Sequence, residues 1–205
     1  MSERPRLVAA LFVDPNGIYA GLPDVDVWDE ARDARLYAGP WPVVAHPPCQ
    51  RWCRFAKGIE TRYGYKVGDD DGCFEAALAA VRRYGGVLEH PAGSLAWDHF
   101  ELPKPKATQG WTASLTEYGA SCYIEQGRYG HPMRKATWLY AYGIDPLNLR
   151  WGRRIDSERG EFKWGSRLYK PEQDRDRPRC DSEHSVTPPA FRDVLLALAS
   201  SAQGC

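Results

Sequence analysis

The chain has no excess of charge of either sign and no long hydrophobic run. Its 205 residues carry 27 Lys and Arg against 27 Asp and Glu, which gives a formal net charge of +0. A cationic field over the whole chain is therefore excluded, and any contact with nucleic acid has to come from a local patch. The longest apolar run extends from Leu7 to Val13, which is far too short to span a bilayer.

A charged-then-apolar signal segment is also missing, because Arg4 and Arg6 lead directly into a predicted strand. Six cysteines in a chain of this size, without a secretory signal, indicate reduced thiols. We therefore expect a soluble, cytoplasmic protein without a membrane partner. Hydrophobic residues make up 43% and aromatic residues 12%, which excludes a disordered chain and suits a single domain.

Three short apolar segments are predicted to be buried strands. They cover residues 7–13, 42–45 and 85–88, and each ends at a polar turn. Between the last two, apolar residues at helical spacing predict a helix over about residues 71–84, with Asp69–Asp71 at its positive end. Strand, helix and strand, with both strands apolar on both faces, are typical of a parallel α/β sheet.

The second half of the chain adds two strands and a helix to this expected fold. The strands are predicted over residues 121–126 and 136–142. The helix closes the chain, with Thr187 as its cap and Pro188 and Pro189 at its start. Its apolar face consists of Phe191, Val194, Leu195 and Leu198.

We divide the chain into an α/β core over residues 1–149, a basic flap over 150–183 and a C-terminal helix over 184–205 that packs on the core. Residues 150–180 hold 10 basic and 6 acidic side chains, a local excess of +4, with aromatics between them. This mixture suits stacking on bases with phosphate contact, and an amphipathic flap with cation–π pairs explains it nearly as well. The residues predicted to bind nucleic acid are Arg153, Arg154, Trp164 and Arg167.

Polar residues follow two of the predicted strands, at the place where open α/β sheets bind their ligands. One strand leads into the segment His46–Gln50 and the next into Glu89–Pro91. If these strands are neighbours, Cys49 and Glu89 lie side by side. A thiol in such a position is a candidate nucleophile, and a carboxyl group beside it exchanges protons with the group that the thiol attacks. A third polar group, from Gln126 to Arg134 and Lys135, brings positive charge to the same edge.

The sequence Pro48-Cys49-Gln50 after a buried strand resembles the nucleophile motif of the cytosine-C5 DNA methyltransferases. Two later motifs of that family follow in order: a Glu-Asn pair, matched by Glu89 with His90 in place of Asn, and a Gln-x-Arg-x-Arg motif, loosely matched by Gln126 and Arg134-Lys135. The resemblance implies a Rossmann-like methyltransferase fold. It also implies that the target base, cytosine first of all, is flipped out of a duplex before reaction.

The resemblance assigns roles to individual residues. Cys49 attacks C6 of the base, Glu89 holds N3 and the exocyclic amine, and Arg134 supports the Cys and the base. The predicted catalytic residues are Cys49, Glu89, Arg134, Lys135, Gln50 and His46. S-adenosylmethionine is the implied methyl donor, and another donor stays open. The predicted cofactor-binding residues are Phe12, Asp14, Gly17, Asp26 and Asp33.

A second interpretation comes from a different class of protein. His46, Cys49 and Cys53 are spaced three and four apart, and Cys180 with His184 would complete a zinc site. The chain would then be a non-catalytic zinc- and DNA-binding protein. Segments 44–49 and 89–94 also look like those of uncharacterised phage and prophage proteins. This likeness suggests a phage origin and does not indicate a reaction. The sequence leaves open whether the partner is DNA or a free pyrimidine nucleotide.

Overall fold

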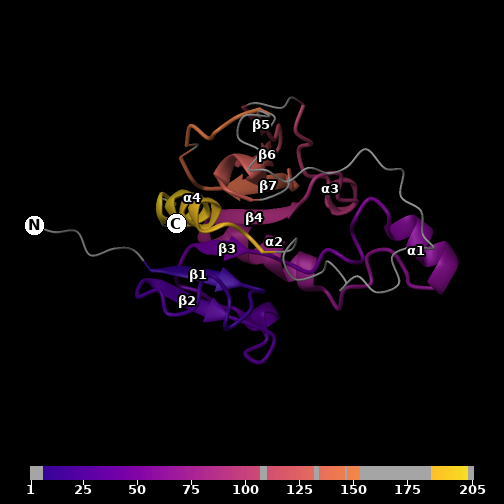
Figure 1. Ribbon diagram of the computed structural model, residues 1–205, viewed down its shortest axis with the longest axis horizontal. Coiled ribbons are helices and arrows are strands. Elements are labelled where there is room, and N and C mark those ends of the chain that lie inside the picture. Colours follow the sequence, from indigo (N-terminus) through magenta and orange to yellow (C-terminus); the bar gives the residue numbers. More distant parts are fainter. Residues whose placement is uncertain (1–6, 107–109, 132–133, 146, 153–185, 203–205) are drawn as a thin grey trace, which may run out of the picture.

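The computed structural model describes residues 7–106, 110–131, 134–145, 147–152 and 186–202 (Figure 1). Within this part of the chain, a seven-stranded sheet has the order β2-β1-β3-β4-β7-β6-β5. Its strands are β1 (Val8–Leu11), β2 (Val25–Trp28), β3 (Val43–Ala45), β4 (Gly86–Pro91), β5 (Trp111–Ala113), β6 (Gly119–Glu125) and β7 (Ala136–Tyr142). The fold is therefore α/β, as the sequence predicts.

The sheet is parallel in one half and antiparallel in the other. Strands β2, β1, β3 and β4 pair in parallel, whereas β4–β7, β7–β6 and β6–β5 are antiparallel pairs. The expectation of a mostly parallel sheet is thus correct only for the first half. The reason is that the short connection from β6 to β7 can join antiparallel neighbours, whereas a parallel pair needs a crossover of a dozen or more residues.

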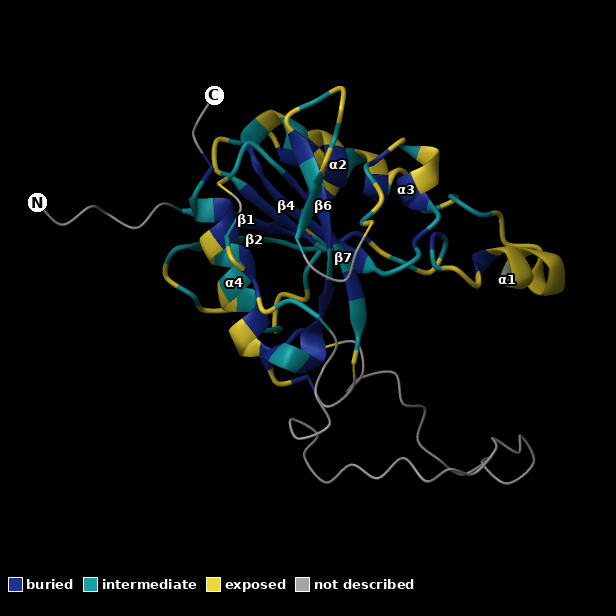
Figure 2. Ribbon diagram, turned by 90° about the horizontal axis from the view of Figure 1, so that it is seen from above, coloured by how far each residue is buried: buried dark blue, intermediate teal, exposed yellow. Residues whose placement is uncertain are grey.

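One long helix covers each face of the parallel half (Figure 1). α2 (Cys73–Tyr84) packs its buried residues Phe74 and Val81 against one face, and α4 (Pro189–Ser200) packs Phe191 and Leu195 against the other. Successive strand residues point to opposite faces, so the short strands serve both layers. The residues facing α2 are Ala9, Leu11, Val43, Ala45 and Leu88, and those facing α4 are Val8, Ala10, Val44 and Val87. Figure 2 shows these strands as the buried centre of the molecule.

The helix boundaries agree with the predictions except at one cap. The N-cap residue of α2 is Gly72, and the Asp70 carboxylate just before it accepts a hydrogen bond from the Phe74 backbone N–H at 2.9 Å, so an acidic residue does lie at the positive end of this helix. At α4 the N-cap residue is Pro188 and no side chain caps the helix, so the prediction for Thr187 is wrong. Pro189 begins the helix because its missing N–H would be unpaired in the first turn anyway.

Several short elements are absent from the sequence prediction. Strand β2 and the edge strand β5 are only half-buried or exposed, and neither has a clear alternating pattern. The short helices are η1 (Ala34–Leu36), α1 (Ala56–Tyr63), α3 (Ala96–His99) and η2 (Gln126–Tyr129). No described helix has the length and apolar character needed to cross a membrane. Most of the predicted basic flap lies outside the described residues.

Gly86 is required where β4 meets β3. Its φ is 129°, and a Cβ there would lie 2.0 Å from the Val43 carbonyl oxygen. We expect Gly86→Ala to destabilise the fold by about 3 kcal/mol or more, because the clash is with backbone that cannot yield. Gly21 is the matched control, since it has a φ of 72° and open space around it. Gly21→Ala should cost only about 1–2 kcal/mol in urea unfolding, and equal losses would contradict the role of Gly86.

Candidate active site

The site lies on the rim where β3 ends and β7 begins, on either side of β4. The register pairs Ala45 with Leu88 and Pro91 with Thr137, so the residue after β3 comes level with Glu89. The observed strand β4 runs to Pro91, which places Glu89 inside the strand and not after it as predicted. Because β7 is antiparallel to β4, its first residues reach the same rim.

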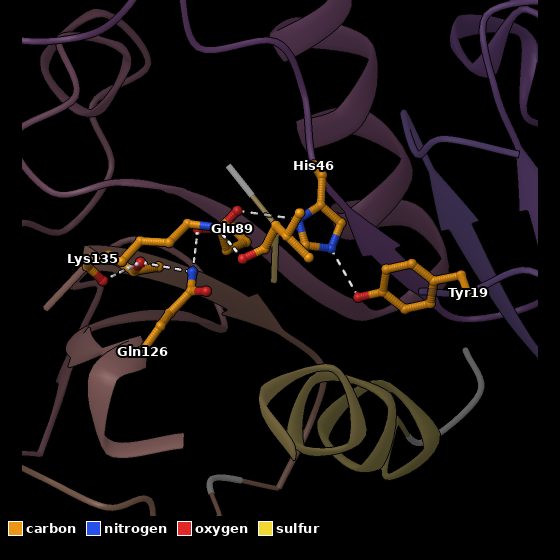
Figure 3. A network of polar contacts seen from close by, with 7 residues as sticks. Tyr19, His46, Glu89, Gln126 and Lys135 are labelled. Carbon is orange, nitrogen blue, oxygen red and sulfur yellow. Dashed lines mark hydrogen bonds and ion pairs between the residues drawn. The ribbon is translucent and has the colours of Figure 1, made fainter. Parts of the chain in front are cut away.

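Glu89 is held from one side by a chain of two side chains (Figure 3). His46 Nδ1 lies 3.1 Å from Glu89 Oε2, and His46 Nε2 lies 2.9 Å from the Tyr19 hydroxyl. Burial raises the pKa of Tyr19 well above its usual range, so its O–H stays protonated and donates to Nε2. His46 then carries its proton on Nδ1 and donates it to the carboxylate, a tautomer assigned from this network. The imidazole thus fixes the orientation of Glu89.

Gln126 holds Glu89 from the other side (Figure 3). Its Nε2 donates to Glu89 Oε1 at 3.1 Å and to Thr137 Oγ1 at 3.0 Å. The Thr137 hydroxyl in turn donates to the Lys135 carbonyl at 3.0 Å. Gln126 and Thr137 are fully buried, so these bonds are shielded from water and define one position for the carboxylate.

The environment keeps Glu89 ionised. Burial by itself raises the pKa of this carboxyl group, but the hydrogen bond and the electrostatic attraction from His46, together with the positive charge of Lys135, outweigh it and hold the pKa below its usual range. One carboxylate oxygen accepts from His46 and the other from Gln126, and a carboxylate offers about four acceptor positions in all. At neutral pH Glu89 is therefore a buried acceptor and a base.

Cys49 lies at the same rim and is half-buried. Its carbonyl accepts hydrogen bonds from the N–H groups of Trp52 at 3.0 Å and Cys53 at 2.8 Å, so a tight turn fixes it directly after the Pro-Pro pair. Burial raises the pKa of the Cys49 thiol, the negative charge of Glu89 adds to this, and Lys135 opposes it. The resting thiol is thus protonated and needs a base, and Glu89 is the carboxylate that interacts with it.

Lys135 is the cation of this rim, and Arg134 is not. Burial lowers the pKa of Lys135, against the opposing effects of Glu89 and Cys49, which both attract its charge. Its backbone φ of 37° lies in the left-handed region, which is uncommon for a side chain of this size and is typical of functional sites. Arg134 points elsewhere, with its Nε 3.0 Å from Glu125 Oε1.

The remaining predicted catalytic residue, Gln50, is exposed, and its carbonyl accepts a weak contact from the Cys53 thiol at 3.9 Å. His90, which stands where the resembling family has Asn, is buried edge-on against the Phe74 ring at 5.2 Å between centroids. Burial lowers its pKa to about 4, so it is a neutral core residue. The rim therefore gathers Cys49, Glu89, His46 and Lys135 of the predicted catalytic set.

The residues predicted to bind S-adenosylmethionine make contacts with neighbouring residues of the chain. The chain makes turns between β1 and β2, and Asp14 accepts the Asn16 N–H at 2.8 Å and, through its carbonyl, the Gly17 N–H at 2.9 Å. Phe12 has a φ of 59° and packs against the core that faces α2.

The two acidic residues expected to hold the ribose and adenine are likewise engaged by neighbours. Asp26 accepts from Trp28 Nε1 at 2.8 Å and from Arg32 at 2.7 Å. Asp33 is paired with Arg35 at 2.7 Å and caps η1. Both carboxylates are thus engaged by neighbouring side chains, and each remains 33% exposed.

Several predicted residues lie outside the described chain. They are Arg153, Arg154, Trp164 and Arg167 of the flap and Cys180 and His184 of the alternative zinc site. Among described residues, no group of three or more His, Cys, Asp or Glu side chains is arranged to hold a metal ion. Both ring nitrogens of His46 are engaged by Tyr19 and Glu89, so it is not placed to bind zinc with Cys49 and Cys53.

A shallow hollow elsewhere on the molecule is a weaker candidate. Its lining includes Gly119 and Gly143, at the start of β6 and just after β7. Because residue Gly119 pairs with Tyr142 and Glu125 with Ala136, this hollow lies at the opposite end of those strands from the rim. Its lining carboxylate, Glu117, is already paired with Arg82.

Tyr19 and Thr137 are site residues that the sequence does not predict. Tyr19 comes from the turns between β1 and β2 and is one tyrosine among eleven, without a motif around it. Thr137 follows Lys135 closely, and its only signal is a hydroxyl in an apolar strand. Comparisons with known protein families, characterised proteins and solved structures give no match.

Proposed function

We propose that the chain is an enzyme that modifies a pyrimidine base at C5, cytosine first of all, through covalent addition of Cys49. The observation that carries this proposal is the rim itself: a thiol shortly after β3 and an ionised, fixed carboxylate in the adjacent parallel strand β4, with a half-buried lysine whose charge acts on both. The parallel half of the sheet is compatible with the Rossmann-like methyltransferase fold that the motif resemblance implies.

The chemistry begins with proton transfer from Cys49 to Glu89. The thiolate then forms a bond to C6 of the base, and the C5–C6 double bond is broken. Glu89 returns the proton to N3 of cytosine, which neutralises the charge that develops on the ring. Lys135 supports the thiolate by its positive charge. His46 and Gln126 keep the carboxylate in place through both transfers.

The product of this addition is an enamine with a nucleophilic C5. S-adenosylmethionine, or another one-carbon donor, would supply a methyl group to that carbon. Without a donor, C5 takes a proton from water, loses either that proton or its original one, and Cys49 then leaves. The base is restored, and when the original proton is the one lost, its C5 hydrogen has been exchanged with solvent. This reaction uses only residues of the described rim and a pyrimidine.

Hydrogen exchange at C5 is therefore the first test. The protein is incubated in D₂O with an oligonucleotide containing cytosine and, separately, with dCMP, and loss of the H5 proton signal is followed by NMR. We expect exchange that depends on intact protein, and the better substrate separates polymer from free nucleotide. Absence of exchange in both, together with no covalent adduct on 5-fluorocytosine DNA under any donor, would contradict the proposal. Zinc in the native mass would then favour the non-catalytic interpretation.

A further inference from the structure

Residues 51–68 leave the body of the molecule directly after Cys49 and return to it before α2, with α1 at their far end (Figures 1 and 2). We call this segment the α1 arm. Its base is fixed, because the Gly68 N–H donates to the Arg51 carbonyl at 3.0 Å and Trp52 Nε1 donates to Asp70 at 2.7 Å. The arm is thus a protrusion anchored at the rim.

The outer part of the α1 arm exposes large aromatic side chains. Phe55 is 63% exposed, Tyr63 61% and Tyr65 53%. Ala56 is the one buried residue of α1 among those whose side chains are described. An eight-residue helix gains little stability by itself in water, and the three exposed rings in and beside it do nothing for the core. Packing within the described part of the chain therefore does not explain these aromatics.

Each of the three rings has an arginine against it. The Arg51 guanidinium lies 4.1 Å from the Tyr65 ring centroid, Arg54 lies 4.6 Å from Phe55, and Arg62 lies 5.4 Å from Tyr63. The arm contains five basic side chains and one acidic side chain, although the whole chain is neutral. This combination of aromatic faces and guanidinium groups suits a strand of bases and phosphates.

We propose that the α1 arm binds single-stranded nucleic acid by stacking bases on Phe55, Tyr63 and Tyr65. The arginines beside the rings contact the phosphates. A single strand is favoured over a duplex because its bases present open faces to side chains, whereas those of a duplex stack on one another. This inference extends the proposed function. That the bound single strand is also the substrate rests on that function.

The position of the arm fits delivery of a strand to the rim. Arg51 is two residues from Cys49, and a methyl group at Gly93, in the turn after β4, would contact Arg54 Cβ at 3.8 Å. The anchored end of the arm therefore lies beside the segment after β3, which carries Cys49, and beside the turn after β4, which carries Glu89. A single nucleic-acid strand bound along the arm would place one of its nucleobases within reach of Cys49.

The test measures binding of a fluorescent oligo(dA) strand by anisotropy at low salt. Adenine offers no pyrimidine C6, so failure of the chemistry at Cys49 does not affect this result. The triple variant Phe55→Ala, Tyr63→Ala, Tyr65→Ala should bind at least about tenfold more weakly than wild type. The matched control replaces Leu115 and Tyr118 by alanine, since these are 102% and 90% exposed on the β5–β6 connection, and it should bind as wild type does.

Salt dependence separates stacking from phosphate contact. Arg54→Gln and Arg62→Gln should each reduce the slope of log K against log salt by about 0.7, whereas the aromatic variant should keep the wild-type slope. Melting curves check that each variant is folded, which we expect because the changed side chains are exposed. Unchanged binding by the triple variant, absence of binding by wild type, or preference for duplex would each overturn the inference.

Discussion

Replacing Cys49 by serine is expected to abolish both C5 hydrogen exchange and covalent capture of 5-fluorocytosine DNA, with a rate loss of about 10³-fold or more. Serine keeps the size of the side chain, but its hydroxyl is a far poorer nucleophile at neutral pH. Fluorine at C5 cannot leave as a cation, so after transfer of an electrophile the wild-type adduct cannot eliminate. Intact mass spectrometry should show this adduct on wild type and none on Cys49→Ser.

Cys53 provides the matched control for this change. It lies one turn further along the chain, is also half-buried, and donates only a weak contact to the Gln50 carbonyl. Cys53→Ser should keep exchange and adduct formation within about twofold, and both variants should unfold within about 1 kcal/mol of wild type. Equal losses in the two variants would argue for a structural or metal-binding role of the pair and against Cys49 as nucleophile.

Replacing Glu89 by glutamine is expected to slow C5 exchange by about 10²–10⁴-fold, the usual contribution of an acid–base group. An amide can neither take the Cys49 proton nor return one to N3. The amide keeps the shape of the carboxylate. It has only one acceptor oxygen, whereas His46 and Gln126 each donate a hydrogen bond to Glu89. We therefore expect a stability loss of about 1–3 kcal/mol with the fold retained.

The pH dependence gives this prediction an independent check. Because the folded protein holds the pKa of Glu89 below its usual value, ionised Glu89 stabilises the fold above the usual carboxyl range. That stabilisation is lost as the pH falls through the lowered pKa. The stability difference between wild type and Glu89→Gln, from urea unfolding, should thus shrink toward acid pH, and a difference that grew would contradict an ionised Glu89.

Glu125 is the control carboxylate for Glu89. Its side chain is fully buried and is paired with Arg134, on the strand next to β7. Glu125→Gln should also cost stability, because it weakens the ion pair between a buried carboxylate and Arg134, but it should leave C5 exchange within a few-fold of wild type. If both variants lost exchange equally, general destabilisation and not acid–base chemistry would explain the effect.

The main strands and long helices could be predicted because their signals are local. Short apolar runs bounded by turns gave β1, β3 and β4, and helical spacing gave α2 and α4. The juxtaposition of Cys49 with Glu89 followed from one general rule, that carboxyl ends of adjacent parallel strands meet at one edge. The outcome depended on β3 and β4 being neighbours, which the structure confirms.

What could not be predicted depends on contacts distant in sequence. Tyr19 and His46 are 27 positions apart in the sequence, and Gln126 and Glu89 are 37 apart, so no local sequence pattern predicts either contact. Lys135, and not Arg134, reaches the rim, and the positive φ of Lys135 in the β6–β7 connection follows from no sequence pattern. The α1 arm has no predictive signal in the sequence, because its aromatics do not follow a periodic core pattern.

The position of α4 has a consequence for the growing chain on the ribosome. This helix is the last described element to be synthesised, yet Phe191, Leu195 and Leu198 pack against one face of strands made much earlier. Until α4 emerges, that face of β1, β3 and β4 is exposed to water and to other nascent chains. We therefore expect truncation before Pro189 to leave a chaperone-dependent, aggregation-prone intermediate, in which the candidate catalytic residues are all present but not yet held in place.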